Sequence, residues 1–324
     1  MRILVTGGSG TIALALHSHL KRQNHDVTLV SRNPAPLHKL GYDCISWTQL
    51  STAYMLSSRF DAVFNMAGAS MMKRWSEQQK SLILSSRLET ITHLYMLVRA
   101  LPRDRRPECI FNASSIAIYS NSDNEVDEYT APSRDSSFFQ ARAWLAIERR
   151  IRQLRIPGVR TVIARMGVVL ANDTAMRVML NLSKLRLCAT LGTGSQRVSW
   201  ISQIDLLRAF SYLLETTGKA GIYNLVAPKH IDAETFTRNI SNSAYKNLRL
   251  NIPARYLELL LGELAQNFLS SIPAKPRRLI EDEFEWRLPV HSQAVQYTLR
   301  QIRKSSSGSP RQSLWRSPAD KWSI

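Results

Sequence analysis

The first half of the chain alternates short runs of apolar, often β-branched residues with longer segments of helical periodicity. The short runs predict buried strands at residues 2–5, 26–30, 62–65, 109–113 and 160–165. In the longer segments apolar residues recur at helical spacing, which predicts helices at residues 76–101 and 139–154. Strands that alternate with helices favour parallel βαβ units, so we expect an α/β fold built on a doubly wound parallel sheet.

The longer of these helices has a recognisable start. Ser76 is followed three residues later by Gln79, just before the apolar positions of the helix begin. This spacing fits a capping box, in which the two side chains satisfy backbone N–H groups of the first turn reciprocally. We therefore expect the helix to begin at Ser76.

The pattern loosens after about Leu170. Helical segments and short strands, such as residues 221–225, continue to about residue 299 and predict a smaller lobe over the carboxyl ends of the strands. The last segment is basic and Ser-rich, which is typical of flexible chain, although its Trp315 and Trp322 could dock on the body or on a partner. We expect a sheet domain at 1–170, a smaller lobe at 171–299 and a flexible tail at 300–324.

The segment between the first strand and the first helix reads Thr-Gly-Gly-Ser-Gly-Thr-Ile-Ala at residues 6–13. Gly7 permits a tight turn, Gly10 lets a pyrophosphate lie against the backbone, and Ala13 lets the helix pack close to the strand. The helix N-terminus then presents free N–H groups and a partial positive charge to the phosphates. This context predicts a dinucleotide site in a Rossmann-type domain.

The end of the second predicted strand bears on the choice of dinucleotide. It reads Ser-Arg-Asn at residues 31–33, with no acidic residue at its tip. NAD sites use an Asp or Glu there to bind the ribose hydroxyls, whereas a guanidinium suits the 2′-phosphate of NADP. We therefore expect NADP(H) in preference to NAD(H), with the alternative that Arg32 is one basic residue among many.

Composition excludes several partners. The 324 residues include 43 Lys and Arg against 25 Asp and Glu, for a net charge of +18. The basic residues are scattered and form no aromatic-studded stripe, so we expect no specific nucleic acid partner. The three cysteines have neither metal nor disulfide spacing, which favours a reducing cytoplasm and no metal site. No apolar stretch fits a signal peptide or approaches the roughly 18 residues of a spanning helix, so we expect no membrane partner.

Further motifs carry a resemblance to a family. Besides the opening residues 1–10, they are Asn-Met-Ala-Gly at 65–68, Lys-Arg-Trp-Ser at 73–76, Ser-Arg at 86–87, Arg-Met-Gly-Val-Val-Leu at 165–170, Leu-Gly-Thr-Gly-Ser-Gln at 191–196, Ser-Trp-Ile at 199–201 and Gly-Ile-Tyr-Asn-Leu-Val-Ala-Pro at 221–228. Over about residues 1–300 the chain resembles the epimerase-like subgroup of the extended short-chain dehydrogenases/reductases. Some of these proteins carry an old label of cell-division inhibitor.

The resemblance implies a set of cofactor-binding residues. They are Gly7, Gly10, Thr11 and Ile12 at the pyrophosphate, Arg32 at the 2′-phosphate, Ala67 and Gly68 at the ribose and adenine, and Ser114, Gly167 and Val168 around the nicotinamide. We expect the substrate to be lined by Lys73, Arg74, Gln140, Trp144, Gln196 and Trp200. Trp200 could instead belong to the core, and Lys73 and Arg74 to the exposed start of a helix.

The wider superfamily moves protons with a Tyr-x-x-x-Lys pair. The Lys lowers the pKa of the Tyr, which is about 10 when unperturbed, and holds the ribose. In this chain the two positions fall at Gln140 and Trp144, which cannot do this chemistry. Ser114 and Tyr119 remain as candidate catalytic residues, with Tyr119 either a proton donor or a lining residue.

Three functions are open at this point. The first is an NADP(H)-dependent oxidoreductase or epimerase acting on a small carbonyl, alcohol or sugar-like substrate, as a monomer or homodimer. The second, favoured by the missing Tyr and Lys, is a non-catalytic NAD(P)-binding module with a regulatory or redox-sensing role. The third is an interaction role built on the basic surface and the tail.

Overall fold

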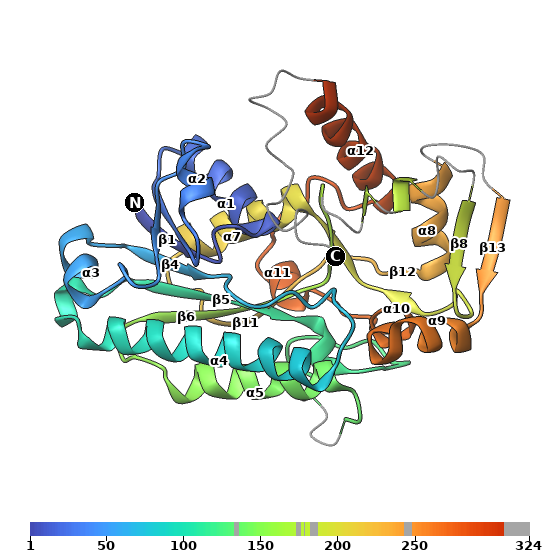
Figure 1. Cartoon of the computed structure of the whole chain (residues 1–324), viewed down its shortest axis with the longest axis horizontal. Coiled ribbons are helices and arrows are strands. Elements are labelled where there is room, and N and C mark those ends of the chain that lie inside the picture. Colours follow the sequence, from blue (N-terminus) through green and yellow to red (C-terminus); the bar gives the residue numbers. More distant parts are fainter. Residues whose placement is uncertain (133–135, 173–175, 178, 182–186, 243–247, 308–324) are drawn as a thin grey trace.

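The computed structural model of the protein describes residues 1–132, 136–172, 176–177, 179–181, 187–242 and 248–307 (Figure 1). Its centre is a seven-stranded parallel sheet in the order β11-β6-β5-β4-β1-β2-β3. The strands are β1 (Arg2–Thr6), β2 (Asp26–Ser31), β3 (Cys44–Ser46), β4 (Ala62–Asn65), β5 (Cys109–Ser115), β6 (Arg160–Met166) and β11 (Gly221–Leu225). The predicted Rossmann-type α/β fold is therefore confirmed, and only the three-residue β3 gave no sequence signal.

The strand order reverses at β1. From β1 the chain builds β2 and β3 on one side, and then β4, β5 and β6 on the other. Thr6, at the end of β1, pairs with Val30 of β2 and with Asn65 of β4, so the three strands end at the same edge. Such a reversal opens a crevice beyond the carboxyl ends of the strands, where doubly wound sheets bind their ligands.

Helices cover both faces of the sheet (Figure 1). On one face α1 (Thr11–Arg22) and α7 (Gln203–Glu215) pack against the strands, and on the other lie α3 (Thr52–Ser58), α4 (Glu77–Ala100) and α5 (Phe139–Gln153). Side chains of β1 alternate accordingly, because Ile3 and Val5 face α1 and α7 whereas Leu4 faces α4. The sheet is therefore enclosed between two apolar layers.

The start of α4 departs from the predicted capping box. The Ser76 hydroxyl accepts a hydrogen bond from the Gln79 N–H at 3.2 Å, as expected. The Gln79 side chain instead donates to the Ser70 carbonyl at 3.1 Å, so it does not reach back to the N–H of Ser76. Only half of the box forms, because the amide of Gln79 ties down the loop that precedes the helix.

The remaining elements lie mostly beyond the carboxyl edge of the sheet. Three two-stranded sheets pair β7 (Val168–Leu170) with β10 (Trp200–Ser202), β8 (Leu187–Leu191) with β13 (Leu248–Ile252), and β9 (Arg197–Val198) with β12 (Ile231–Asp232). The other helical segments are α2 (Ala35–His38), η1 (Arg103–Arg105), η2 (Ile116–Tyr119), α8 (Ala233–Asn242), α9 (Ala254–Leu261), η3 (Gly262–Ala265), α10 (Gln266–Leu269), α11 (Arg277–Glu281) and α12 (His291–Ser307).

The chain crosses between the two regions more than once. The sequence-based boundary at residue 170 assigns residues 221–225 to the smaller lobe, yet these residues form β11 and pair with β6 in the central sheet. Residues 300–307 of the expected tail continue α12, and residues 308–324, with Trp315 and Trp322, lie outside the described part of the chain. Within the described ranges, no helix combines the length and apolar character needed to cross a membrane.

Candidate functional site

The glycine turn closes tightly against the end of β4. Gly7 has a φ of +71°, and a Cβ at this position would lie 2.7 Å from the Met66 carbonyl oxygen. The neighbouring Gly8 donates its N–H to the Val30 carbonyl at 2.9 Å. A side chain at Gly7 would therefore both strain the backbone and push the turn away from β4.

The N-terminus of α1 is open to a ligand. Gly10 is its N-cap and makes no side-chain capping bond, and the first turn contains no acidic residue. The N–H groups of Thr11 and Ile12 thus remain for an anion, since the first turn of a helix has no intrahelical acceptors. The Gly10 N–H donates to the Gly7 carbonyl at 2.8 Å and keeps the turn compact. This uncapped, glycine-rich turn fits a pyrophosphate.

Arg32 lies at the same edge as the glycine turn. Val30 of β2 pairs with Thr6, the residue just before the glycine turn, and Arg32 follows Val30 by two residues. Its side chain is exposed, and none of the ion pairs between described residues involves it. The hydroxyl of Ser31 accepts from the Asn33 N–H at 3.3 Å and shapes the strand tip. The guanidinium is thus available to a phosphate beside the crevice.

The ends of β1, β4 and β5 are joined by buried polar side chains. The Thr6 hydroxyl donates to the Asn65 side-chain oxygen at 2.8 Å and accepts from the Met66 N–H at 3.2 Å. These bonds hold the start of the segment that contains Ala67, which is half-buried, and Gly68, which is exposed. The structure therefore brings the glycine turn, the tip of β2 and the segment after β4 to the same edge of the sheet.

Ser114 lies at the end of β5 but points into a buried ion pair. It is 1% exposed, and its hydroxyl donates to Glu148 Oε1 at 2.8 Å. The same carboxylate accepts from Arg165 Nε and Nη2, both at 2.8 Å. A hydroxyl has a single proton, so in this arrangement Ser114 can accept a hydrogen bond from a ligand but cannot donate one.

Tyr119 belongs to the same buried network. Its hydroxyl oxygen accepts from Arg165 Nη1 at 2.7 Å and lies within donating distance of the Asp127 carbonyl, at 2.6 Å, and the Asn224 side-chain oxygen, at 3.0 Å. The ring is 5% exposed, and burial raises the pKa of Tyr119 to about 12. The phenol is therefore neutral at physiological pH and is surrounded by protein partners.

Sequence reasoning missed the charged members of this network, Glu148 and Arg165. A signal was present in each case. Arg165 interrupts an otherwise apolar stretch of β6, and Glu148 sits on the buried face of α5 with Ile147 and Ile151 as buried neighbours. A charge at such a position requires a partner, because an isolated buried ion is too costly to retain.

The expected substrate-lining residues separate into three places. Gln140 lines a small hollow together with Trp75, Ser120 and Ser270. Trp144 lies one turn later on α5 and is buried. Lys73 and Arg74 are exposed in the loop before α4.

Gln196 and Trp200 lie inside the smaller lobe. The Gln196 amide donates to the carbonyls of Leu191 and Phe268, at 2.8 and 3.0 Å. Trp200 is 1% exposed and packs edge-on against His291, with ring centroids 4.8 Å apart. Both side chains are therefore enclosed by protein atoms.

Gly167 and Val168 connect the sheet to the smaller lobe. A Cβ at Gly167 would lie 2.6 Å from the Ser199 carbonyl oxygen, so this glycine permits a close approach of two chain segments. The next residue, Val168, is 46% exposed at the start of β7. Val168 is therefore the more accessible of the two.

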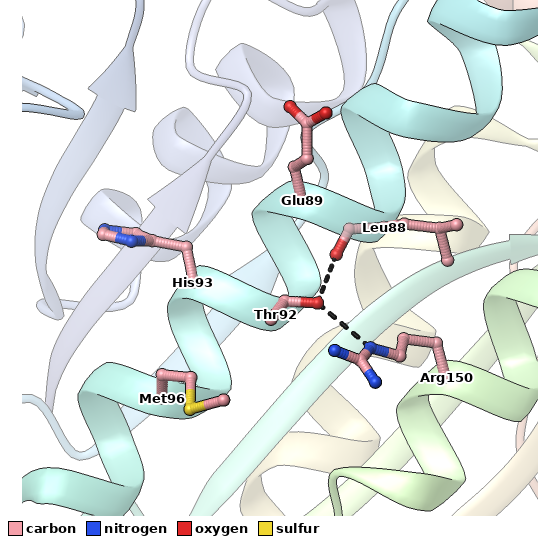
Figure 2. A pocket seen from close by; sticks show the side chains of 6 residues that line it. All are labelled: Leu88, Glu89, Thr92, His93, Met96 and Arg150. Carbon is pink, nitrogen blue, oxygen red and sulfur yellow. Dashed lines mark hydrogen bonds between the residues drawn. The ribbon is translucent and has the colours of Figure 1, made fainter.

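Another hollow lies on the outer surface of α4 and α5 (Figure 2). It is lined by Leu88, Glu89, Thr92, His93, Met96 and Arg150, and Arg150 Nε donates to the Thr92 hydroxyl at 3.0 Å. None of the expected site residues borders it. The described residues also contain no group of three or more His, Cys, Asp or Glu side chains that could hold a metal ion.

Comparison with known proteins places this geometry in a family. Residues 3–225 match the family model of the NAD dependent epimerase/dehydratase family. Epimerase family protein YfhF of Bacillus subtilis (strain 168) is 29% identical over 287 residues, which cover 88% of this chain and 94% of that protein.

Solved structures are similar as well. The human epimerase family protein SDR39U1 (isoform2), solved with NADPH, has a TM-score of 0.83 and 30% identity, covering 93% of this chain and 99% of that one. UDP-glucuronic acid 4-epimerase from Bacillus cereus, solved with NAD, has a TM-score of 0.73 at 14% identity, over 96% of this chain and 100% of that one, and so shares the fold. The resemblance expected from the motifs is confirmed: this chain belongs to the NAD-dependent epimerase/dehydratase family.

Proposed function

We propose that this chain binds NADP(H) in the crevice at the carboxyl edge of the sheet and prefers it to NAD(H). The observation that carries the proposal is the exposed Arg32 at the tip of β2, which forms no ion pair with another described residue and follows the strand paired with β1, before the uncapped α1 N-terminus. A guanidinium at this tip suits a 2′-phosphate, and no acidic side chain stands there to bind ribose hydroxyls. The human relative solved with NADPH supports this choice, whereas the more distant epimerase was solved with NAD.

Different residues at this edge of the sheet would bind different parts of the cofactor. Gly7, Gly10, Thr11 and Ile12 would hold the pyrophosphate through backbone N–H groups. Ala67 and Gly68 would line the ribose and adenine side, and Gly167 and Val168 would border the nicotinamide and the substrate. When bound, the nicotinamide ring supplies or accepts a hydride.

Calorimetric titration tests the binding proposal. Wild-type protein should bind NADPH more tightly than NADH, and Arg32→Gln should remove most of this difference because it deletes the charge that faces the 2′-phosphate. Arg22→Gln, a change of another basic residue at the end of α1, serves as the control and should leave the preference intact. Equal affinity of the wild type for both nucleotides would contradict the assignment of Arg32.

Two roles for the bound cofactor follow from different observations. Family membership favours an oxidoreductase or epimerase that acts on a small carbonyl, alcohol or sugar-like substrate. The hydroxyls of Ser114 and Tyr119 favour the second role, a non-catalytic regulatory or redox-sensing module, because both already bond to protein partners. The second role is also favoured by Gln140 and Trp144, because these residues cannot act as the proton-transferring Tyr and the cationic Lys of the superfamily motif.

A carbonyl panel separates the two roles. Protein is mixed with NADPH and each compound, and the absorbance of the reduced nicotinamide is followed. Sustained oxidation that Ser114→Ala abolishes, while NADPH affinity is retained, would establish turnover and exclude the purely binding role. For turnover Ser114 would have to turn its hydroxyl away from Glu148 toward the substrate oxygen, so a Ser114→Ala variant as active as the wild type would remove this residue from the chemistry.

We also place the protein in the reducing cytoplasm. The described cysteines Cys44 and Cys109 are buried and unpaired. Burial raises the pKa of Cys44 to about 11 and that of Cys109 to about 12, so both stay as protonated, unreactive thiols. Fractionation of cells that express the tagged chain tests this placement.

A further inference from the structure

Arg87 is a partly buried cation that has no acidic partner among the residues the structure describes. It lies on α4, and none of the ion pairs among the described residues involves it. Burial lowers the pKa of Arg87 to about 10, which still leaves it charged at physiological pH. A positive charge that loses part of its hydration without gaining a carboxylate is costly, so its surroundings call for an explanation.

The guanidinium lies directly behind the segment that follows β4. A Cβ at Gly68 would be 2.6 Å from Arg87 Cζ, so a side chain at this position would displace the guanidinium from its present place. Arg87 Nη1 donates to the Ala69 carbonyl at 3.0 Å and to the Ile83 carbonyl at 3.1 Å. The neighbouring Ser86 hydroxyl accepts from the Ala69 N–H at 3.0 Å, so α4 holds this segment from both backbone groups.

The two hydrogen bonds of Arg87 use only one of its three side-chain nitrogen atoms. Nη1 makes both of the hydrogen bonds given above, and neither Nε nor Nη2 of Arg87 donates to another described residue. An arginine offers five N–H donors in a fixed fork, so donors remain for a ligand beside Gly68. Gly68 itself is exposed at the crevice.

Trp144 joins this arrangement from α5. Arg87 Cζ lies 5.2 Å from the centre of the Trp144 ring, which is a cation–π contact. Trp144 occupies the position where the sequence motif of the superfamily would have its lysine. A cation from α4 is therefore stacked on the α5 side chain at this motif position.

We propose that Arg87, oriented by Trp144 and admitted by Gly68, takes over the cofactor contact of the missing lysine and donates hydrogen bonds to the hydroxyls of the nicotinamide-side ribose. The inference rests on the proposed binding of NADP(H). It assigns to Arg87 the nicotinamide-side ribose, on the side of the Gly68 segment that faces Trp144, whereas the same segment lines the adenine side and Arg32 binds the 2′-phosphate. The positive charge then lies beside the nicotinamide, where it favours an electron-rich substrate oxygen.

The test uses two ligands that differ in the part assigned to Arg87. NADPH contains the nicotinamide ribose, whereas adenosine 2′,5′-bisphosphate contains only the adenosine half with the phosphate that Arg32 would bind. Removing a hydrogen bond from a charged donor weakens binding by about 10- to 100-fold. Arg87→Gln should therefore weaken NADPH by this factor in a calorimetric titration and leave adenosine 2′,5′-bisphosphate unchanged. Arg150→Gln, at the outer surface of the same two helices, is the matched control and should change neither.

A second, more conservative variant tests the inference even if Arg87→Gln fails to fold. Arg87→Lys retains the charge and the aliphatic stem but not the planar fork, and it should give an intermediate NADPH affinity. Wild-type binding of NADPH by both variants would overturn the inference while leaving the proposed function intact. Equal weakening of both ligands would also overturn it, because Arg87 would then only support the loop at Gly68. Absence of any nucleotide binding by the wild type would instead refute the proposed function itself.

Discussion

Replacing Glu148 by glutamine tests the buried network that connects β5, β6 and α5. The Glu148 side chain has no exposed surface, and its partner Arg165 is 1% exposed. The carboxylate accepts two bonds from Arg165, one from Ser114 and one from Arg152, at 2.8 to 2.9 Å. Glutamine keeps the shape but removes the charge and turns an NH2 group toward a guanidinium.

The magnitude follows from the burial of the pair. Breaking a buried ion pair on one side leaves an uncompensated charge, which costs about 3 to 5 kcal/mol. An exposed pair of the same length is worth about 1 kcal/mol or less. Arg277 and Glu281 form such a pair, at 2.8 Å with side chains 55% and 47% exposed, so Glu281→Gln is the matched control.

The assay is urea unfolding followed by tryptophan fluorescence and by circular dichroism. We expect Glu148→Gln to lower the free energy of unfolding by about 3 to 5 kcal/mol and the control to change it by about 1 kcal/mol or less. The double variant Glu148→Leu/Arg165→Met should recover much of the loss, because it removes both charges together. If Glu148→Gln were no more destabilising than Glu281→Gln, the pair would not hold these elements together.

Three further predictions concern the glycine turn, the cofactor and acid stability. Gly7→Ala should destabilise the fold by more than Gly41→Ala in urea unfolding, since both glycines have a positive φ but only Gly7 would place a Cβ 2.7 Å from a carbonyl oxygen; equal losses would contradict the steric argument. Arg32→Glu should weaken NADP+ by about 10-fold or more, measured by equilibrium dialysis, because it places a carboxylate beside a phosphate; unchanged NADP+ affinity would remove Arg32 from the site. Burial lowers the pKa of His291 to about 4, so the unfolded chain binds its proton first. The contribution of His291 to the free energy of unfolding should be fully present above about pH 6.5 and should fall by about 3 kcal/mol as the pH is lowered to 4. His291→Phe should remove this contribution to the pH dependence of unfolding.

Much of the fold could be predicted because it is encoded locally. Residues 2–5 and 62–65 are apolar enough to be read as buried strands, and both lie in the centre of the sheet. The glycine turn could be recognised because its φ and its close contact with Met66 admit no side chain at Gly7. These are constraints on single residues and their immediate neighbours.

The candidate site was harder to predict because its members are distant in sequence. Ser114 ends a strand at the expected edge, but the direction of its hydroxyl depends on Glu148, 34 residues later. The pairing of β11 with β6 also depends on packing across a long connection. Arg87 was visible as part of a motif, yet its contact with Trp144, and the lack of a carboxylate beside it among the described residues, follow only from the packing of α4 on α5.

Thermal unfolding with and without nucleotide tests the binding of NADP(H) most directly. A ligand at about one hundred times its dissociation constant stabilises the folded state by about 2.7 kcal/mol, which raises the midpoint of the transition measurably. We expect NADP+ to raise the midpoint, and NAD+ at the same concentration to raise it less. A larger shift with NAD+ would contradict the role of Arg32, and no shift with either nucleotide would contradict the proposal that this crevice binds a dinucleotide.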